Sequence, residues 1–151
     1  PGHTAGHIAY VGADDETGPL AFVGDTLFAC GCGRLFEGTA QQMWTSLSKL
    51  AALDPASRMY CAHEYTVSNL RFALAAEPGN SDLHARMARE QARRARGEPT
   101  VPSVLADELA TNPFLRAGQA SLMQSAARHA GREVHDAVET FAILRGWKDG
   151  F

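Results

Sequence analysis

The sequence predicts an α+β fold, in which a segment of mixed strands and helix is followed by helices. Short apolar runs bounded by turn residues occur before residue 66, and an apolar face at helical spacing follows Thr39. No convincing strand pattern follows Tyr65. We therefore expect a mixed segment over residues 1–66 and an all-helical segment over residues 67–151.

The first segment should contain a hairpin, a helix and a third strand. Apolar runs at 8–12 and 20–24 flank a polar, turn-rich stretch and should pair as a hairpin. Thr39 followed by Gln42 matches a capping box, so a helix should begin there. The apolar face of this helix consists of Met43, Leu47, Leu50 and Ala51. Asp54-Pro55 should end the helix, and the next strand should cover residues 58–61.

The second segment should consist of helices separated by glycine and proline. Pro78-Gly79 and Gly97 act as stops, and Ser81 is expected to cap a helix. The expected helices cover 67–77, 81–96, 103–110, 120–130 and 136–144. A basic run on one of them contains acids and lacks an aromatic neighbour, which favours a solvated face: Arg86, Arg89, Arg93, Arg94 and Arg96.

Composition limits the partners and the compartment. The net charge is −3, so we expect neither a nucleic acid nor a membrane as partner, and we expect a monomer. The three cysteines, Cys30, Cys32 and Cys61, form no disulfide-like framework, which favours a reducing compartment such as the cytoplasm. Cys30 and Cys32 are too closely spaced for a Cys-x-x-Cys motif, so we expect small buried or turn residues.

Three candidate metal ligands lie next to predicted strands. Asp25 follows the second strand, His3 lies in a glycine-flanked turn before the first, and His63 follows the third. Histidine and carboxylate suit a borderline metal such as zinc, and a carboxylate can bridge two ions. The alternatives are a turn histidine, a turn-capping aspartate and a polar strand end. As ligands, their atoms should converge within roughly 4–7 Å, and His7 should be a supporting residue.

Four motifs resemble those of glyoxalase II, the hydroxyacylglutathione hydrolase branch of the metallo-β-lactamase superfamily. They occur in family order at residues 1–8, 24–28, 31–39 and 62–66, and the similarity continues from Asn112 to the end of the chain. The resemblance implies the second half of a metallo-β-lactamase-type αββα sandwich, followed by a helical domain that binds glutathione. The family also has an earlier His-x-His-x-Asp-His block, which this sequence lacks. We therefore expect the carboxyl-terminal part of a longer enzyme, inactive as this chain alone.

The resemblance also assigns roles to individual residues. It implies that His3 binds one divalent metal, His63 binds a second, and Asp25 bridges them as the catalytic carboxylate. Zinc is the expected metal, with iron or manganese as alternatives. The positions that align with glutathione-contacting residues of the family are Arg34, Phe36, Tyr65, Arg145 and Lys148.

Two of these glutathione positions depart from a common family pattern. Many members carry lysine and tyrosine where Arg34 and Phe36 stand; Arg34 preserves the charge, whereas Phe36 offers packing only. For Arg145 and Lys148 the alternative is a solvated helix end.

The implied reaction is hydrolysis of S-D-lactoylglutathione, or a related 2-hydroxyacyl thioester, to glutathione and a hydroxy acid, as in methylglyoxal detoxification. A mononuclear-iron persulfide dioxygenase of the same superfamily is an alternative, with ligands that resemble His3 and Asp25. The helical tail and the ending at residues 145–148 argue against it. A non-catalytic glutathione-binding fragment is a further alternative, supported by the missing histidine block.

Overall fold

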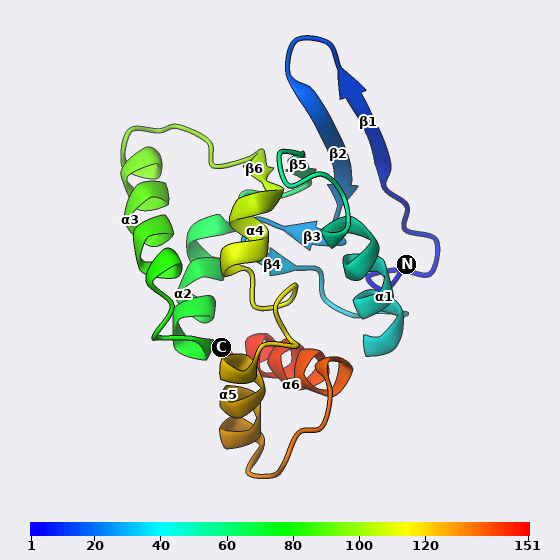
Figure 1. Cartoon of the computed structure of the whole chain (residues 1–151), viewed down its shortest axis with the longest axis vertical. Helices are drawn as coiled ribbons and strands as arrows, with labels where there is room; N and C mark the ends of the chain where they lie inside the picture. The colour runs from blue at the N-terminus through cyan, green and yellow to red at the C-terminus, as the bar shows by residue number, and fades with distance from the viewer.

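The computed structural model describes residues 1–151 as a mixed α/β chain with six helices and a small sheet (Figure 1). The helices are α1 Ala40–Ala51, α2 Thr66–Ala76, α3 Ser81–Ala95, α4 Leu105–Thr111, α5 Ala120–Ala130 and α6 Ala137–Asp149. The strands are β1 Tyr10–Asp14, β2 Gly18–Gly24, β3 Leu27–Phe28, β4 Gly31–Cys32, β5 Arg58–Cys61 and β6 Ser103–Val104. None of the helices has both the length and the apolar character needed to cross a bilayer.

The main sheet has four strands in the order β1-β2-β5-β6. β1 and β2 form the predicted antiparallel hairpin, and β5 has the predicted bounds. β5 pairs parallel to β2, which requires a crossover, and α1 provides it. β3 and β4 form a separate two-stranded hairpin that the sequence analysis did not identify.

Strand β6 corrects the expectation that no strand follows Tyr65. Ser103 and Val104 pair antiparallel with Met59 and Arg58 of β5, and α4 begins only at Leu105. Two residues carry no alternation that a sequence pattern could reveal, so only the tertiary pairing defines this strand.

The predicted capping box of α1 is confirmed. The Thr39 hydroxyl accepts a hydrogen bond from the Gln42 amide, and the Gln42 side chain accepts one from the Thr39 amide. The helix buries Met43, Leu47 and Leu50, as its spacing predicted. Two other helix ends differ from expectation: the cap of α3 is Asn80 instead of Ser81, and α6 continues past residue 144 to Asp149.

The sheet and the helices share one hydrophobic core. Its 16 buried residues include Val23 and Met43 from the first segment and Phe72, Phe114 and Phe141 from the second. The three phenylalanine rings pack on one another with centroids 5.8–5.9 Å apart. The boundary near residue 66 stays a prediction, but apolar burial joins the residues on its two sides.

The basic run on α3 is not a wholly solvated face, contrary to expectation. Arg86 is only 2% exposed and Glu90 only 3%, because this side of α3 packs towards α4. Arg86 forms an ion pair with Glu108 of α4 at 2.6 Å. The charge of a buried arginine needs such a partner, and a partner 22 residues away leaves no local trace in the sequence.

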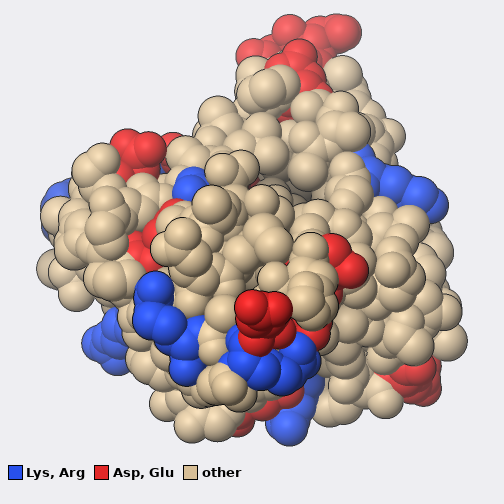
Figure 2. Space-filling model, turned by 60° about the horizontal axis from the view of Figure 1, so that its bottom comes forward, with Lys and Arg blue, Asp and Glu red and all other residues tan.

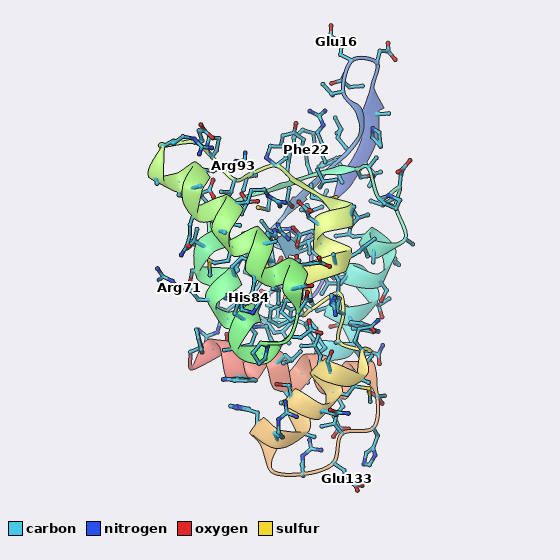
Figure 3. The ribbon with its side chains drawn as sticks, turned by 60° about the vertical axis from the view of Figure 1, so that its left-hand side comes forward. Glu16, Phe22, Arg71, His84, Arg93 and Glu133 are labelled. Carbon is cyan, nitrogen blue, oxygen red and sulfur yellow. The ribbon has the colours of Figure 1, made fainter.

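The β1–β2 hairpin projects from the body of the molecule (Figure 1). Figure 3 places Glu16 at its tip and Glu133 at the opposite end of the molecule, and Figure 2 shows acidic side chains gathered at the projecting end. Apolar side chains nevertheless remain exposed on and beside this hairpin: Ile8 63%, Tyr10 67%, Val11 60% and Phe22 51%. Tyr10 and Phe22 are register partners, and exposed apolar side chains gathered in this way are typical of a surface that another element covers.

Candidate functional site

Strand pairing brings the three candidate ligands to one edge of the sheet. Gly24, at the end of β2, is in register with Cys61, at the end of the parallel strand β5, and the Ala62 amide donates to the Gly24 carbonyl at 3.1 Å. Asp25 and His63 follow these two strand ends. β1 runs antiparallel to β2, so the segment before it, which contains His3, starts from the same edge.

The two histidines approach different oxygens of one carboxylate. His63 Nε2 lies 3.3 Å from Asp25 Oδ1, and His3 Nε2 lies 3.7 Å from Asp25 Oδ2. The expected convergence is therefore present, at slightly shorter distances than the 4–7 Å anticipated. The three side chains form two histidine–carboxylate pairs, and no closed group of three metal ligands is present.

Backbone geometry aims Asp25 into the site. The register between β2 and β5 shifts between Phe22 and Gly24, and Gly24 adopts a φ of 51°, which favours glycine. The Asp25 amide donates a hydrogen bond to His7 Nε2 at 3.1 Å. His7 therefore supports the position of Asp25, in agreement with its expected secondary role.

A hydrogen bond also orients His3. Its Nδ1 lies 2.8 Å from the Arg34 carbonyl oxygen, and since a carbonyl only accepts, Nδ1 carries the proton. The lone pair then lies on Nε2, the atom that faces Asp25, as in histidines that bind metals. Gly33 permits this approach, because a Cβ there would lie 1.9 Å from the Asp25 carbonyl oxygen and 3.1 Å from His3 Nδ1.

The carboxylate of Asp25 fits a cation. Its Oδ1 is buried and has no hydrogen-bond partner. A buried carboxylate oxygen without a partner is costly, and either a metal ion or a proton on His63 would satisfy it. Nitrogen and carboxylate donors suit zinc, iron and manganese alike, so the donor set does not choose the metal.

A groove runs from these ligands to the end of α6. It consists of two adjoining hollows of about 380 Å³ and 210 Å³, which share Phe28, Arg34 and Tyr65 as walls. The larger hollow also contains His3, Asp25, Phe36 and His63, and the smaller one also contains Cys32, Asn69, Arg145, Lys148 and Asp149. All eight predicted site residues therefore line the groove that these two adjoining hollows form.

Aromatic rings form walls beside the histidines. Tyr65 stacks on His63 with centroids 5.0 Å apart, and Phe36 meets the His3 ring edge-on at 5.1 Å. Both aromatic side chains are exposed, at 50% and 67%. They restrict the imidazole orientations and present apolar surface where a ligand would enter.

The other end of the groove is cationic. The Arg34 side chain is 59% exposed, with its Nε 3.6 Å from Asp149 Oδ1. Lys148 is partly buried, and its ammonium lies 5.7 Å from the centre of the Phe72 ring. Burial, and then the nearby Arg145 charge, lower the pKa of Lys148.

Arg145 is not part of a solvated helix end. It is 6% exposed and donates from Nη1 to the Cys32 carbonyl at 2.8 Å and from Nη2 to Asp149 Oδ1 at 3.1 Å. Asp149 thus contacts two cations of the groove, a role that the sequence analysis missed. Its position four residues after Arg145 on one helix is the signal that could have revealed it.

The cysteines supply no nucleophile. Burial raises the pKa of Cys30 to about 12 and that of Cys32 to about 11. Both are free thiols in the turn of the β3–β4 hairpin and its second strand, which confirms them as small buried residues. Thiols with such a pKa stay protonated near neutral pH and are unreactive.

Comparison with known proteins gives a consistent result. A family model described as hydroxyacylglutathione hydrolase C-terminus matches residues 64–151. Proteins named hydroxyacylglutathione hydrolase are 58% identical in Cupriavidus metallidurans, 59% in Alkalilimnicola ehrlichii and 53% in Pseudomonas aeruginosa. These alignments cover 100%, 99% and 100% of this chain, but only 56%, 56% and 58% of the relatives. The chain therefore spans little more than half the length of these relatives.

Replacing Asp25 by asparagine tests the metal assignment. In the complete protein, Asp25→Asn keeps the shape but removes the charge that would stabilise bound cations, so metal affinity should fall at least about tenfold. Metal content after desalting, by elemental analysis, measures this. Asp15→Asn, at the exposed hairpin tip, is the matched control. Equal metal content in both variants would contradict the assignment.

Proposed function

Because this chain belongs to the hydroxyacylglutathione hydrolase family, we propose that it is the carboxyl-terminal part of a thioester hydrolase. The proposed substrate is S-D-lactoylglutathione or a related S-(2-hydroxyacyl)glutathione, and the products are glutathione and a 2-hydroxy acid such as D-lactate. The persulfide dioxygenase alternative is not favoured, since the relatives carry the hydrolase name.

The observation that carries this proposal is the pair of adjoining hollows that lies between the His–Asp–His edge and the cationic end of α6 and shares Phe28, Arg34 and Tyr65 as walls. A glutathione thioester has its reacting carbonyl at the sulfur and its carboxylates at the two ends of the peptide. Arg34, Arg145 and Lys148 supply charge for those carboxylates. The exposed Arg34 can bind one through two parallel hydrogen bonds, whereas both Nη atoms of Arg145 already donate within the protein. The thioester then lies towards Asp25 and the two histidines.

His3, Asp25 and His63 are the residues of this chain that would hold divalent metal ions, with zinc as the first choice. When bound, such ions lower the pKa of water and polarise a carbonyl. The chain itself would supply the bridging carboxylate, the oriented His3 imidazole and the apolar walls of Tyr65 and Phe36 beside the reacting group. A thiolate leaves readily because the thiol pKa is near 8.5, so the groove needs no strong general acid.

Three further expectations belong to this proposal. The sheet would form half of an αββα sandwich, which the exposed apolar residues Ile8, Tyr10, Val11 and Phe22 support. The enzyme would work in the cytoplasm, a prediction that rests on the unpaired cysteines, and as a monomer. The candidate boundary near residue 66 would separate the metal-binding part from the glutathione-binding part.

Activity should depend on ligands outside residues 1–151. A longer protein that includes an upstream His-x-His-x-Asp-His block should hydrolyse S-lactoylglutathione. The measurement is the loss of thioester absorbance with metal present. The 151 residues alone should show no meaningful turnover, because two histidines and one carboxylate are too few for a dinuclear site. Robust turnover by the short chain would contradict this account. Glutathione binding without hydrolysis by the extended protein would favour the non-catalytic alternative.

A Lys148 variant tests whether this residue contributes to substrate binding without contributing to the chemical step. Lys148→Ala should raise KM by roughly 10–150-fold with little change in kcat, because one charge-assisted hydrogen bond is worth about 1.5–3 kcal/mol in ground and transition states alike. Lys49→Ala, on the exposed side of α1, is the control. Arg145→Ala should lower kcat as well, since it also releases the Cys32 carbonyl. An unchanged KM for Lys148→Ala would remove this residue from the glutathione site.

A further inference from the structure

The turn of the β3–β4 hairpin has a backbone that is unfavourable for its sequence. Phe28 pairs with Gly31, so Ala29 and Cys30 form a two-residue connection. Cys30 has a φ of 57° and is the only non-glycine residue of the chain with a positive φ. Side chains with a Cβ rarely adopt this region, which persists only where the surroundings enforce it.

Buried side chains from the helical segment hold this turn at every residue. Asn112 Nδ2 donates to the carbonyls of Phe28 at 3.2 Å and Gly31 at 3.0 Å, and Asn69 Nδ2 donates to that of Ala29 at 3.0 Å. Glu108 Oε2 accepts a hydrogen bond from the Cys30 amide at 2.8 Å. The turn's own strands have only two residues each, so these contacts determine its conformation.

Glu108 is the centre of this network. It is fully buried, and its Oε2 also accepts from Asn112 Nδ2 at 2.9 Å. Its Oε1 accepts from Arg86 Nη2 at 2.6 Å, and Arg86 Nη1 donates to the Thr111 hydroxyl at 2.7 Å. Burial alone would lower the pKa of Arg86, but the Glu108 carboxylate raises it above the ordinary value. One buried carboxylate therefore joins α3, α4 and the strained residue of the turn.

The turn determines where two parts of the groove lie. Phe28, its first residue, lines both hollows. After the turn the chain returns beside its own start, where the Gly33 amide donates to the Thr26 carbonyl at 3.3 Å. The next residue, Arg34, provides the carbonyl that orients His3 and the side chain at the cationic end. A relaxed turn would displace both ends of the groove at once.

We propose that Glu108 is a positioning residue for the reaction: through the Cys30 amide it holds the turn at residues 28–31, and so keeps Phe28, Arg34 and His3 in working geometry. The helical segment then shapes the reacting end of the groove in addition to binding the substrate. This inference rests on the proposed function for its kinetic consequence, whereas the control of the turn by Glu108 stands on the contacts alone.

The test compares two buried carboxylates in the complete, metal-loaded protein. Glu108→Gln keeps the size of the side chain but loses the charge that pairs with Arg86 and adds a donor where only donors surround it. Glu77→Gln is the matched control, because Glu77 is 6% exposed and pairs with Arg116 at 2.8 Å. Glu77 lines a separate hollow that shares no residue with the groove. Both variants should lower the melting temperature.

Only Glu108→Gln should alter the site. We expect its kcat to fall about 10–100-fold, the loss typical of a misplacement near 1 Å, while Glu77→Gln stays within about twofold of the parent. Equal losses of kcat in the two variants, at equal losses of stability, would reduce Glu108 to a structural role and overturn the proposal.

The rate at which the cysteine thiols are modified gives a second readout, which does not depend on enzyme activity. Cys30 and Cys32 are buried, so an aromatic disulfide reagent should modify them slowly in the parent protein. Glu108→Gln should accelerate their modification at least about tenfold at a temperature where circular dichroism shows a folded protein, and Glu77→Gln should not. If Glu108→Gln does not fold, Glu108→Asp takes its place, since it keeps the charge that faces Arg86 but shortens the reach to the Cys30 amide. Unchanged thiol rates in the folded variant would overturn the proposal, even if the thioester proves not to be the substrate.

Discussion

The parallel pairing of β2 with β5 is the constraint on which the rest of the site depends. Two parallel strands have their carboxyl ends at one edge, so the residues that follow them, Asp25 and His63, meet although 38 positions separate them. The antiparallel β1 places the segment containing His3 at the same edge. A register slip of one residue in β2 would reverse its side chains and remove Asp25 from the histidines.

The two ends of the groove differ in charge: one presents a carboxylate between imidazoles, and the other presents a cluster of cations. At the sheet edge, one carboxylate faces two imidazoles, and its Oδ1 lacks a hydrogen-bond partner. At the other end, cations from the β3–β4 hairpin region and α6 surround a single acid, Asp149. An anionic ligand atom would relieve the repulsion between these cations, and a cation would satisfy Asp25. The proposed substrate and metal ions would therefore be complementary to opposite ends of one surface.

The sequence predicted the elements whose signals are local. The hairpin, the capping box at Thr39, the strand at residues 58–61 and the helix at residues 120–130 depend on neighbours in the chain. Strands β3, β4 and β6 were missed because two-residue strands carry no periodicity. His3, Asp25 and His63 were singled out from their motifs as candidate ligands, a role that stays a prediction, and the short distances between them follow from the sheet.

Polar contacts between residues far apart in the chain could not be predicted from the sequence. Glu108 lies 78 residues from the Cys30 amide that it binds, and Asn112 lies 84 residues from the Phe28 carbonyl. Nothing in the local pattern distinguishes these side chains from an acidic helix face or a helix-end asparagine. Arg86 was misjudged for the same reason, since its partner lies on another helix. Buried polar networks are specified by packing, so they are found only when the packing is known.

The most direct test of the central claim is a crystal structure of the complete protein with zinc and glutathione bound. The account predicts the glutathione sulfur at the end lined by His3, Asp25 and His63, and a glutathione carboxylate within hydrogen-bond distance of Lys148 or Arg34. It also predicts that the ligand occupies both hollows, with Phe28 and Tyr65 between its ends. Glutathione bound outside the groove, or bound with its sulfur towards α6, would contradict it.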